Sequence, residues 1–379
     1  MIKKDLTWLE DELQYVLKKI KENETDFYEK VPWAVSKDLV YEATPNAYWT
    51  SSFWLGMLFL AKEATGDDSF DEIIANQMAS FTDRLDKKIE LDTHDIGFLY
   101  TLSAMADYKV NGHESSAKLA VQAADELMTR YNEKAGIIQA WGNLADENEN
   151  GRMIIDCLMN LPLLYFASQM TGDDRYRKAA TRHAKQTQKY IIRDNSTTYH
   201  TYFFDRQTGE AVRGETAQGY SDDSCWARGQ AWGIYGFSLS YLYTGDESFL
   251  ESAEEIADYF ISQLPADYVV YWDLVFNDGS EEERDSSAAA IAANGLLELA
   301  KHLPLSHPKR ELYEETAIKI IKSLSESYTT KGISQANGLL QHGVYDKNSN
   351  KGVDESTIWG DYFYFESLIR LTRSWYMYW

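Results

Sequence analysis

The sequence predicts an all-α fold in which six helical hairpins close into a toroid, and three patterns carry this prediction. Six clusters of polar and aromatic residues each precede an apolar run with helical spacing. A short Thr-Gly-acidic motif recurs where several runs end. The chain also contains 11 Trp, 26 Tyr and 15 Phe, with Trp and Tyr frequent at the heads of the runs. Parallel inner helices would bring all the clusters to one mouth, so we expect a single shared pocket.

The clusters are spread along the whole chain. They are Tyr48-Trp49-Thr50-Ser51, Thr93-His94-Asp95, Arg152-Met153-Ile154-Ile155-Asp156, Asp223-Ser224-Cys225-Trp226-Ala227-Arg228, Arg284-Asp285-Ser286-Ser287 and Trp359-Gly360-Asp361. Each is expected to head one inner helix.

The ends of the runs repeat one another. Thr65-Gly66-Asp67 returns as Thr171-Gly172-Asp173 and again as Thr244-Gly245-Asp246. In each copy the Gly is expected to close one helix and the Asp to cap the next. Repeated hairpins either stack into an open solenoid or close into a ring. The aromatic residues favour closure, because sugar sites use such rings as flat apolar platforms with a hydrogen-bonding edge; the open solenoid remains the alternative.

One domain spanning residues 1–379 is expected, because no linker rich in Pro, Gly or Ser interrupts the chain and only 6 Pro occur. The first residues lack the long apolar segment of a secretory signal and instead place Leu9, Leu13 and Val16 on one face of an amphipathic helix. No uncharged run reaches the ~20 apolar residues that span a bilayer. We therefore expect a cytoplasmic protein that does not insert into membranes.

The formal net charge is −23, from 37 basic and 60 acidic residues. This balance argues against a nucleic-acid partner, which requires clustered Lys and Arg, and against anionic membranes. An anionic small molecule would need a local cation, and Arg228 between Trp226 and Trp232 is the candidate. An interior ion pair is the other explanation of Arg228. Cys157 and Cys225 form neither a disulfide framework nor a zinc set.

Strand content is expected to be small. Residues 199–205 and 210–213 flank a turn at Thr208-Gly209 and read as a β-hairpin. Between two helical hairpins it would form a loop over one mouth of the ring. His200 could then reach the pocket.

Two carboxylates are the main chemical candidates. Asp95 and Asp156 each stand at or near a predicted helix start and are followed by strongly apolar sequence. Burial against an apolar wall raises the pKa of a carboxyl group, and a second carboxylate nearby raises it further, which suits a general acid. Ordinary helix capping by Asp is the alternative at both positions.

No metal or cofactor is expected. His94-Asp95 invites comparison with the His-Asp dipeptide of all-helical metal phosphohydrolases, but those sites resemble a pattern with a further His upstream, and no His precedes His94. The sequence also lacks a phosphate-binding loop, a dinucleotide fingerprint and a G-x-S-x-G motif.

Four motifs in order resemble the unsaturated glucuronyl hydrolases of glycoside hydrolase family 88. They are His94-Asp95-Ile96-Gly97-Phe98, Arg152-Met153-Ile154-Ile155-Asp156, Trp226-Ala227-Arg228-Gly229-Gln230-Ala231-Trp232 and Trp359-Gly360-Asp361-Tyr362-Phe363. The resemblance implies an (α/α)6 barrel, a cytoplasmic location and no metal. It also implies a substrate class: the unsaturated oligosaccharides that polysaccharide lyases leave behind.

The resemblance assigns roles to individual residues. Asp156 would protonate the substrate double bond and serve as the base for water, and Asp95 would accept sugar hydroxyls and help to keep Asp156 protonated. The remaining residues would bind substrate: His94 and His200 beside the carboxylates, Gln218 and Arg228 as partners for the uronate, and Trp49, Trp141 and Trp232 as stacking walls.

The loop from Asp346 to Gly352 bears on the substrate. Family members that act on sulfated glycosaminoglycan fragments resemble one another in a loop with Ser and Lys, and this chain has Ser349 and Lys351 there, with Asp346 where another hydroxyl is expected. We expect disaccharides of the chondroitin or hyaluronan type, with sulfate near Lys351; a solvated turn is the alternative for the loop. An unsaturated rhamnogalacturonyl hydrolase acting on pectin fragments, and a non-hydrolytic sugar epimerase or binding toroid, remain open. The sequence carries no prediction of oligomeric state.

Overall fold

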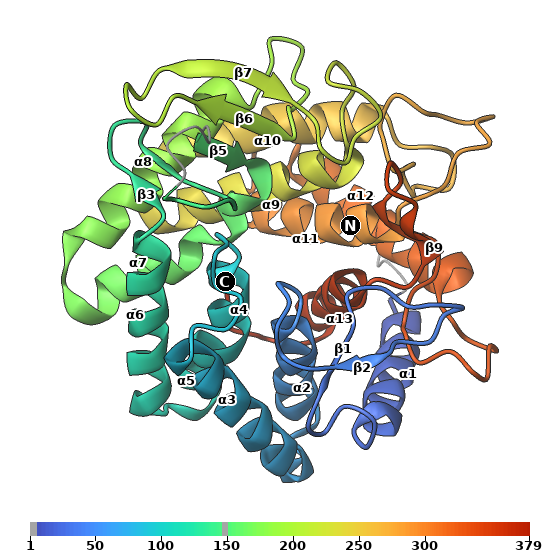
Figure 1. The fold of residues 1–379 in the computed structure, drawn as a ribbon. Coiled ribbons are helices and arrows are strands. Elements are labelled where there is room, and N and C mark those ends of the chain that lie inside the picture. Colours follow the sequence, from blue (N-terminus) through green and yellow to red (C-terminus); the bar gives the residue numbers. More distant parts are fainter. Residues whose placement is uncertain (1–5, 146–150) are drawn as a thin grey trace.

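The computed structural model describes residues 6–145 and 151–379 and arranges its helices in two rings, one inside the other (Figure 1). The inner helices are α2 (Ser52–Thr65), α4 (Ile96–Tyr100) continued by the π-turn η2 (Thr101–Met105) into α5 (Ala106–Asn111), α7 (Leu161–Thr171), α9 (Ala227–Thr244), α11 (Ser286–His302) and α13 (Ile358–Thr372). The outer helices are α1 (Trp8–Asn23), α3 (Asp71–Asp86), α6 (Glu114–Met128), α8 (Asp174–Tyr190), α10 (Glu247–Ser262) and α12 (Arg310–Ser323).

The inner ring closes where the last helix meets the first. Helix α13 packs against both α11 and α2, and α2 continues the ring to η2. The outer helix α1 packs on α13, so the two ends of the chain build one hairpin together, while the other hairpins are consecutive in sequence (Figure 1). The predicted (α/α)6 barrel is confirmed. An open solenoid is excluded, because its terminal helices would not touch.

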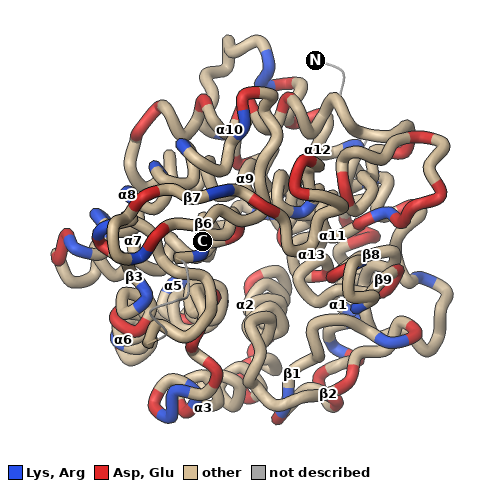
Figure 2. The backbone as a smooth tube through the Cα atoms, turned by 45° about the horizontal axis from the view of Figure 1, so that its top comes forward, with Lys and Arg blue, Asp and Glu red and all other residues tan. Residues whose placement is uncertain are grey.

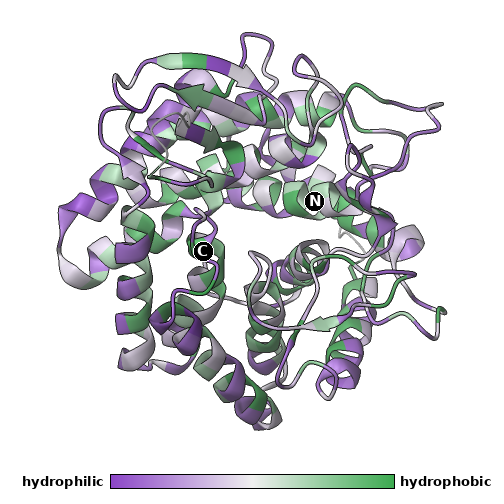
Figure 3. Cartoon of the chain, viewed as in Figure 1, coloured by the Kyte–Doolittle hydropathy of each residue, from purple (hydrophilic) through white to green (hydrophobic). Residues whose placement is uncertain are grey.

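Burial explains which helices are inside. Every residue of α9 from Ala227 to Ser240 is buried, since this helix packs against neighbours on all sides. The outer helix α8 buries one face, which includes Tyr176, His183 and Thr187. Acidic and basic segments are spread over the outer helices and loops (Figure 2), and apolar residues concentrate in the inner helices (Figure 3).

The repeated helix ends have the predicted geometry. Gly66, Gly172 and Gly245 follow α2, α7 and α9 in the left-handed conformation, with φ of 66°, 72° and 67°. The Asp after each Gly then accepts a hydrogen bond from the backbone N–H two residues on; these are Asp67, Asp173 and Asp246. Each pair ends an inner helix and begins the next outer segment within a few residues.

Short strands decorate the barrel. The predicted hairpin is present as β6 (Thr201–Phe204) and β7 (Ala211–Glu215). The other strands are β1 (Val31–Pro32), β2 (Ala43–Thr44), β3 (Tyr131–Asn132), β4 (Ile137–Ile138), β5 (Gly151–Ile154), β8 (Gly343–Asp346) and β9 (Lys351–Glu355). Antiparallel pairing joins β5 to β6, β1 to β2, β3 to β4 and β8 to β9.

One predicted helix head is wrong. Arg152, Met153 and Ile154 lie in β5 instead, because their backbones pair with β6. A short 3-10 helix, η3 (Ile155–Met159), follows directly and carries Asp156. Helix α7 begins only at Leu161, with Pro162 in its first turn, where the missing backbone N–H of Pro costs no hydrogen bond.

The segment after α13 fills the end of the barrel at the C-termini of the inner helices. Trp379 is 1% exposed, stacks on Phe363 at 5.7 Å between ring centroids, and donates its indole N–H to Glu366 at 2.8 Å. Lys109 of α5 holds the same segment by donating to the carbonyls of Met377 and Tyr378. No helix among the described residues has both the length and the apolar character needed to cross a membrane.

Replacing this buried indole is expected to destabilise the barrel. Trp379→Ala should lower the free energy of unfolding by about 3–5 kcal/mol, the usual range for a large aromatic side chain removed from a core. Tyr376→Ala is the control, because Tyr376 is 75% exposed in the same segment, and it should stay within about 0.5 kcal/mol of the parent chain. Denaturant unfolding measures both, and equal midpoints for the two variants would contradict the packing described.

Candidate active site

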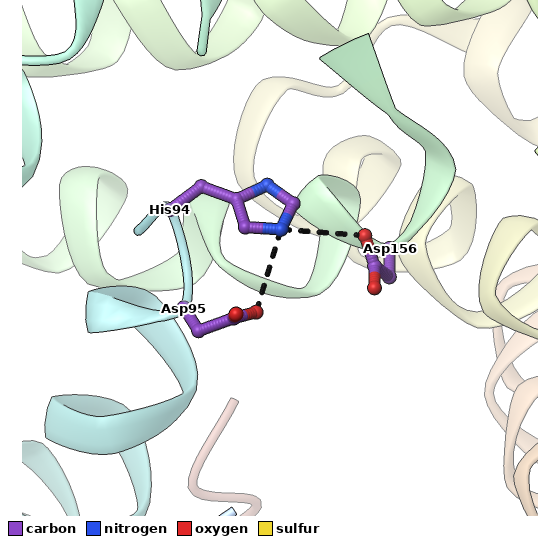
Figure 4. Close-up of side chains that lie close together, drawn as sticks. All are labelled: His94, Asp95 and Asp156. Carbon is purple, nitrogen blue, oxygen red and sulfur yellow. Dashed lines mark ion pairs between the residues drawn. The ribbon is translucent and has the colours of Figure 1, made fainter. Parts of the chain in front are cut away.

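Three side chains from two distant segments meet near the N-termini of the inner helices. His94 and Asp95 precede α4, and Asp156 lies in η3. The His94 ring lies between the carboxyl groups, with Nε2 3.4 Å from Asp95 Oδ1 and 3.5 Å from Asp156 Oδ1 (Figure 4). The sequence predicted these three residues together, and the structure places them together.

A close backbone contact joins the two segments. Asn160 Oδ1 accepts a hydrogen bond from the backbone N–H of Phe98 at 2.6 Å. A Cβ on Gly97 would lie 2.3 Å from Asn160 Cα, so only glycine allows this approach. Sequence reasoning missed Asn160, although it is the one amide in the apolar run that follows Asp156.

Burial sets the protonation of all three groups. It lowers the pKa of His94 to about 3, which leaves the imidazole neutral. It raises the pKa of Asp95 to about 6, although Thr93 Oγ1 donates to this carboxylate at 2.7 Å. It raises the pKa of Asp156 well above the ordinary value, and the negative charge of Asp95 raises it further. Burial and the charge of Asp95 thus both favour the protonated form of Asp156.

Several polar atoms of this group lack hydrogen-bond partners. Both ring nitrogens of His94 and Oδ1 of Asp156 are buried without one. Buried polar atoms are satisfied in the great majority of cases, so such orphans require a reason. Here they lie together in one place, as expected where a reacting molecule is bound.

His200 is held by backbone donors. Its Nδ1 accepts from the backbone N–H groups of Ala217 and Gln218, at 3.1 and 3.2 Å. This assigns the ring proton to Nε2. Burial lowers the pKa of His200 to about 3, so the ring is a neutral donor, 4.2 Å from the Trp226 ring between centroids.

Arg228 and Gln218 converge on one carbonyl. Arg228 is 2% exposed, pairs with Asp285 at 2.9 Å and donates to the Tyr345 carbonyl at 2.7 Å. Gln218 Nε2 donates to the same oxygen at 3.0 Å. The interior ion pair that the sequence allowed for Arg228 is thus present. The pKa of Asp156 is raised mainly by burial, and the positive charge of Arg228 acts against that rise.

The predicted aromatic walls differ in exposure. Trp49 is partly exposed, stacks on Trp359 at 5.3 Å between centroids and donates its indole N–H to the Tyr345 hydroxyl at 3.1 Å. Trp141 is 39% exposed. Trp232 is 1% exposed and packs against Phe98 and Phe363 in the barrel core. Its ring therefore has no exposed face on which a sugar could stack, contrary to the predicted role.

Lys351 lies in an aromatic cage that the sequence did not reveal. Its ammonium group is 5.6, 5.1 and 4.5 Å from the ring centroids of Trp33, Tyr48 and Tyr345, and it donates to the Tyr48 hydroxyl at 3.1 Å. The Tyr48 and Tyr345 hydroxyls are 2.7 Å apart. This network runs from Lys351 to Trp49 through Tyr345. Ser349 is exposed in the turn between β8 and β9.

His94, Asp95 and Asp156 also have the geometry to hold a metal ion. One ligand atom from each lies within 4.8 Å of the others. One imidazole and two carboxylates suit a divalent ion, although Asp156 would have to lose its proton first. The expectation of a metal-free site stays a prediction.

Comparison with known proteins identifies the family. The model described as Glycosyl Hydrolase Family 88 matches residues 16–364. The chain belongs to this family. It is a glycoside hydrolase, and the resemblance found in the sequence motifs is confirmed.

Relatives of the family 88 chain match along almost its whole length. The unsaturated chondroitin disaccharide hydrolase of Streptococcus pneumoniae is 46% identical over 364 residues, covering 96% of this chain and 92% of the relative. The unsaturated glucuronyl hydrolase of Bacillus sp. strain GL1 is 44% identical over 353 residues, covering 93% and 94%. The crystal structure of unsaturated glucuronyl hydrolase from Streptococcus agalactiae superposes with a TM-score of 0.95 at 44% identity, covering 98% of this chain and 93% of that one.

Removing the charge of Asp95 is expected to shift the pH dependence of turnover. Ionised Asp95 disfavours ionisation of Asp156, so Asp95→Asn should lower the pKa of Asp156. If protonated Asp156 is the active form, the alkaline limb of kcat/KM should move to lower pH, by about one unit.

The readout is the position of the limb, so a lower maximal rate does not affect it. Asp83→Asn is the control, because Asp83 is an exposed carboxylate on α3 that pairs with Lys87, and its profile should match the parent chain. An alkaline limb that stays in place, or moves to higher pH, in Asp95→Asn would contradict the coupling.

Proposed function

We propose that this family 88 chain is an unsaturated glucuronyl hydrolase that releases the 4,5-unsaturated uronic acid from lyase-generated oligosaccharides. The favoured substrates are glycosaminoglycan disaccharides of the chondroitin or hyaluronan type. The observation that carries the proposal is the Asp156 carboxyl group, which lies beside His94 and Asp95 with its Oδ1 buried, and whose pKa burial and the Asp95 charge raise well above the ordinary value. A carboxyl group that keeps its proton until the substrate is bound is what protonation of a carbon–carbon double bond requires.

The relatives support this substrate class. Three streptococcal relatives named unsaturated chondroitin disaccharide hydrolase are 44–47% identical to the chain. A mutant of the Streptococcus agalactiae enzyme is described in complex with dGlcA-GalNAc6S, at a TM-score of 0.88. An unsaturated glucuronyl hydrolase specific for heparin is more distant, at 31% identity. The chondroitin type is therefore favoured over the heparin type.

The chemistry follows from the structure of a lyase product. Its terminal uronate carries a double bond between C4 and C5, conjugated with the carboxylate, and the ring oxygen makes it a vinyl ether. Asp156 donates its proton to C4, and positive charge develops at C5. Water adds at C5 and gives one proton back to Asp156. The product is a hemiketal at C5. Opening of the ring yields a ketone at C5 and a hemiacetal at C1, and the hemiacetal collapses to an aldehyde and the free neighbouring sugar.

Asp95 and His94 serve Asp156 in this scheme. The ionised Asp95 keeps the proton on Asp156 until the substrate takes it, and accepts sugar hydroxyls. Neutral His94 contributes no positive charge that would ionise the donor prematurely. Because the reaction begins at C4 and C5, the separation rule for inverting and retaining carboxylate pairs does not apply.

The binding roles follow the placement of the remaining residues. Arg228 and Gln218 form the polar side of the uronate subsite, together with the neutral donor His200. Trp49 and Trp141 offer ring faces to the sugars. Arg228 acts through its charge and through the Tyr345 carbonyl that it fixes, since Asp285 already shares its guanidinium group.

Lys351 is proposed to receive a sulfate group on the second sugar. The aromatic cage immobilises its ammonium group, and no carboxylate among the described residues forms an ion pair with it. Asp346, which stands where a hydroxyl was expected, turns one oxygen to the backbone N–H groups of Asn348 and Ser349 in the hairpin turn. The proposal also retains the cytoplasmic location that the resemblance implies.

Asp156→Asn is expected to keep the fold and abolish turnover, because an amide cannot donate the proton to C4. Loss of ultraviolet absorbance from an unsaturated chondroitin disaccharide reports hydration directly, since hydration destroys the conjugated chromophore. The parent chain should bleach the substrate, and the variant should slow it by at least about 10³-fold. Persistent absorbance with the folded parent chain would contradict the substrate class. If the parent chain instead turned over unsaturated products derived from pectin, the rhamnogalacturonyl alternative would be favoured.

Lys351→Ala is expected to separate sulfated from unsulfated substrates. Loss of one charge-assisted contact should lower kcat/KM for a sulfated disaccharide about tenfold or more, and leave the unsulfated one nearly unchanged. Lys347→Ala is the matched control, because Lys347 lies in the same turn but is paired with Glu283. Equal effects of Lys351→Ala on the two substrates would rule out sulfate binding at this position.

A further inference from the structure

Trp141 is fixed at its backbone between the catalytic segment and β5. The backbone N–H of His94 donates to the Ala140 carbonyl at 2.7 Å, and the Ala140 N–H donates to the Arg152 carbonyl at 2.8 Å. Trp141 itself forms a β-bridge with Thr93. The backbone therefore gives Trp141 a defined place beside Thr93, two residues before Asp95, but it does not fix the plane of the indole ring.

The side chain that meets this ring is Arg152. Its guanidinium carbon lies 4.8 Å from the Trp141 ring centroid and 5.1 Å from the Phe203 ring centroid. Arg152 and Phe203 are direct partners in the register of β5 and β6, and Phe203 is the partner of Arg213 in β7. Arg213 lies 4.9 Å from Phe203. Cations and aromatic rings thus alternate in a row across the sheet and end at Trp141.

The partly exposed Trp49 and the exposed Trp141 differ in their support. Trp49 stacks on another indole and donates its N–H to Tyr345. Among the described residues, no aromatic ring stacks on Trp141, which is 39% exposed. A planar guanidinium group against one ring face restricts rotation of the indole and leaves the other face for a ligand. Arg152 thus does for Trp141 what Trp359 does for Trp49.

We propose that Arg152 is a positioning residue for substrate, which holds the Trp141 ring in the plane that a sugar stacks on. Arg152 lies on β5, and β5 runs directly into η3 with Asp156. The support of the sugar platform and the proton donor are therefore carried by one short segment. This inference rests on the proposed function, because it takes Trp141 as the stacking platform.

Steady-state kinetics on an unsaturated chondroitin disaccharide test the proposal. Arg152→Ala should raise KM about threefold to tenfold with kcat nearly retained, the size expected for one cation–π contact. Arg152→Lys should recover part of the loss, because an ammonium group keeps the charge but not the stacked plane. Arg213→Ala is the matched control: it removes a similar contact one strand further from Trp141, and KM should not change.

A double-mutant cycle with Trp141→Ala makes the test specific. If Arg152 acts through the indole, the double variant should have the KM of Trp141→Ala alone, since the support has nothing left to hold. Additive effects would overturn the proposal, as would a loss confined to sulfated substrates, which would indicate direct contact of Arg152 with the anion. A fall in kcat at unchanged KM, together with a lower unfolding midpoint for Arg152→Ala, would also overturn it, by revealing a structural role.

The outcomes separate this inference from the proposed function. If the parent chain turns over no unsaturated disaccharide, the proposed function fails. If the parent chain turns over substrate and Trp141→Ala raises KM while Arg152→Ala does not, the proposed function stands and the inference is overturned. If Trp141→Ala leaves KM unchanged, the platform is elsewhere and the inference is overturned as well.

Discussion

The close contact between Gly97 and Asn160 is the constraint on which the rest of the site depends. It lets the head of α4 approach the start of α7 so closely that a single Cβ would not fit between them. The hydrogen bond from Phe98 to Asn160 fixes this approach. Asp95 and Asp156 consequently lie on either side of His94, and burial there raises the pKa of both carboxyl groups.

The barrel makes such a contact possible. Its inner helices are parallel, so their N-terminal segments meet at one mouth, and residues distant in sequence become neighbours there. The inner ring closes where α13 packs against α2, and α1 packs on α13, so the first and last helices build one hairpin together. At the other end of the ring, Trp379 and Lys109 hold the segment that fills the interior. The polar chemistry is thus confined to one mouth and the opposite end is packed.

Local patterns predicted much of this fold. Helix ends marked by Gly66, Gly172 and Gly245 depend on neighbouring residues only, and each has the predicted conformation. Repeated hairpins were predicted because the same helix-end signature recurs, and ring closure was predicted from the aromatic residues at the heads of the runs. The β5 strand was not predicted, because residues 151–154 form a strand only by pairing with β6, which lies some 50 residues later in the chain.

The residues of the candidate site also fall into two groups, those that local sequence patterns predicted and those that depend on contacts in the folded chain. Asp95, Asp156 and His94 stood out because polar residues ahead of apolar helical runs are visible in a sequence. Asn160 did not stand out, since its role depends on the packing of α4 against η3 and α7. The partner of Arg228 is Asp285, and the cage around Lys351 joins Trp33 to Tyr345; the chain brings these together only in three dimensions. The burial of Trp232 likewise follows from its place inside the ring.

The protonation state of Asp156 in the resting enzyme tests the central claim most directly. Carbon-13 NMR of the chain labelled at the aspartate carboxyl carbons, with Asp156→Asn used to assign the resonance, reports this state without turnover. The account predicts a protonated Asp156 carboxyl at pH 7, where exposed aspartates are ionised. A resonance for Asp156 that titrates near the ordinary aspartate pKa, and is fully ionised at pH 7, would contradict it.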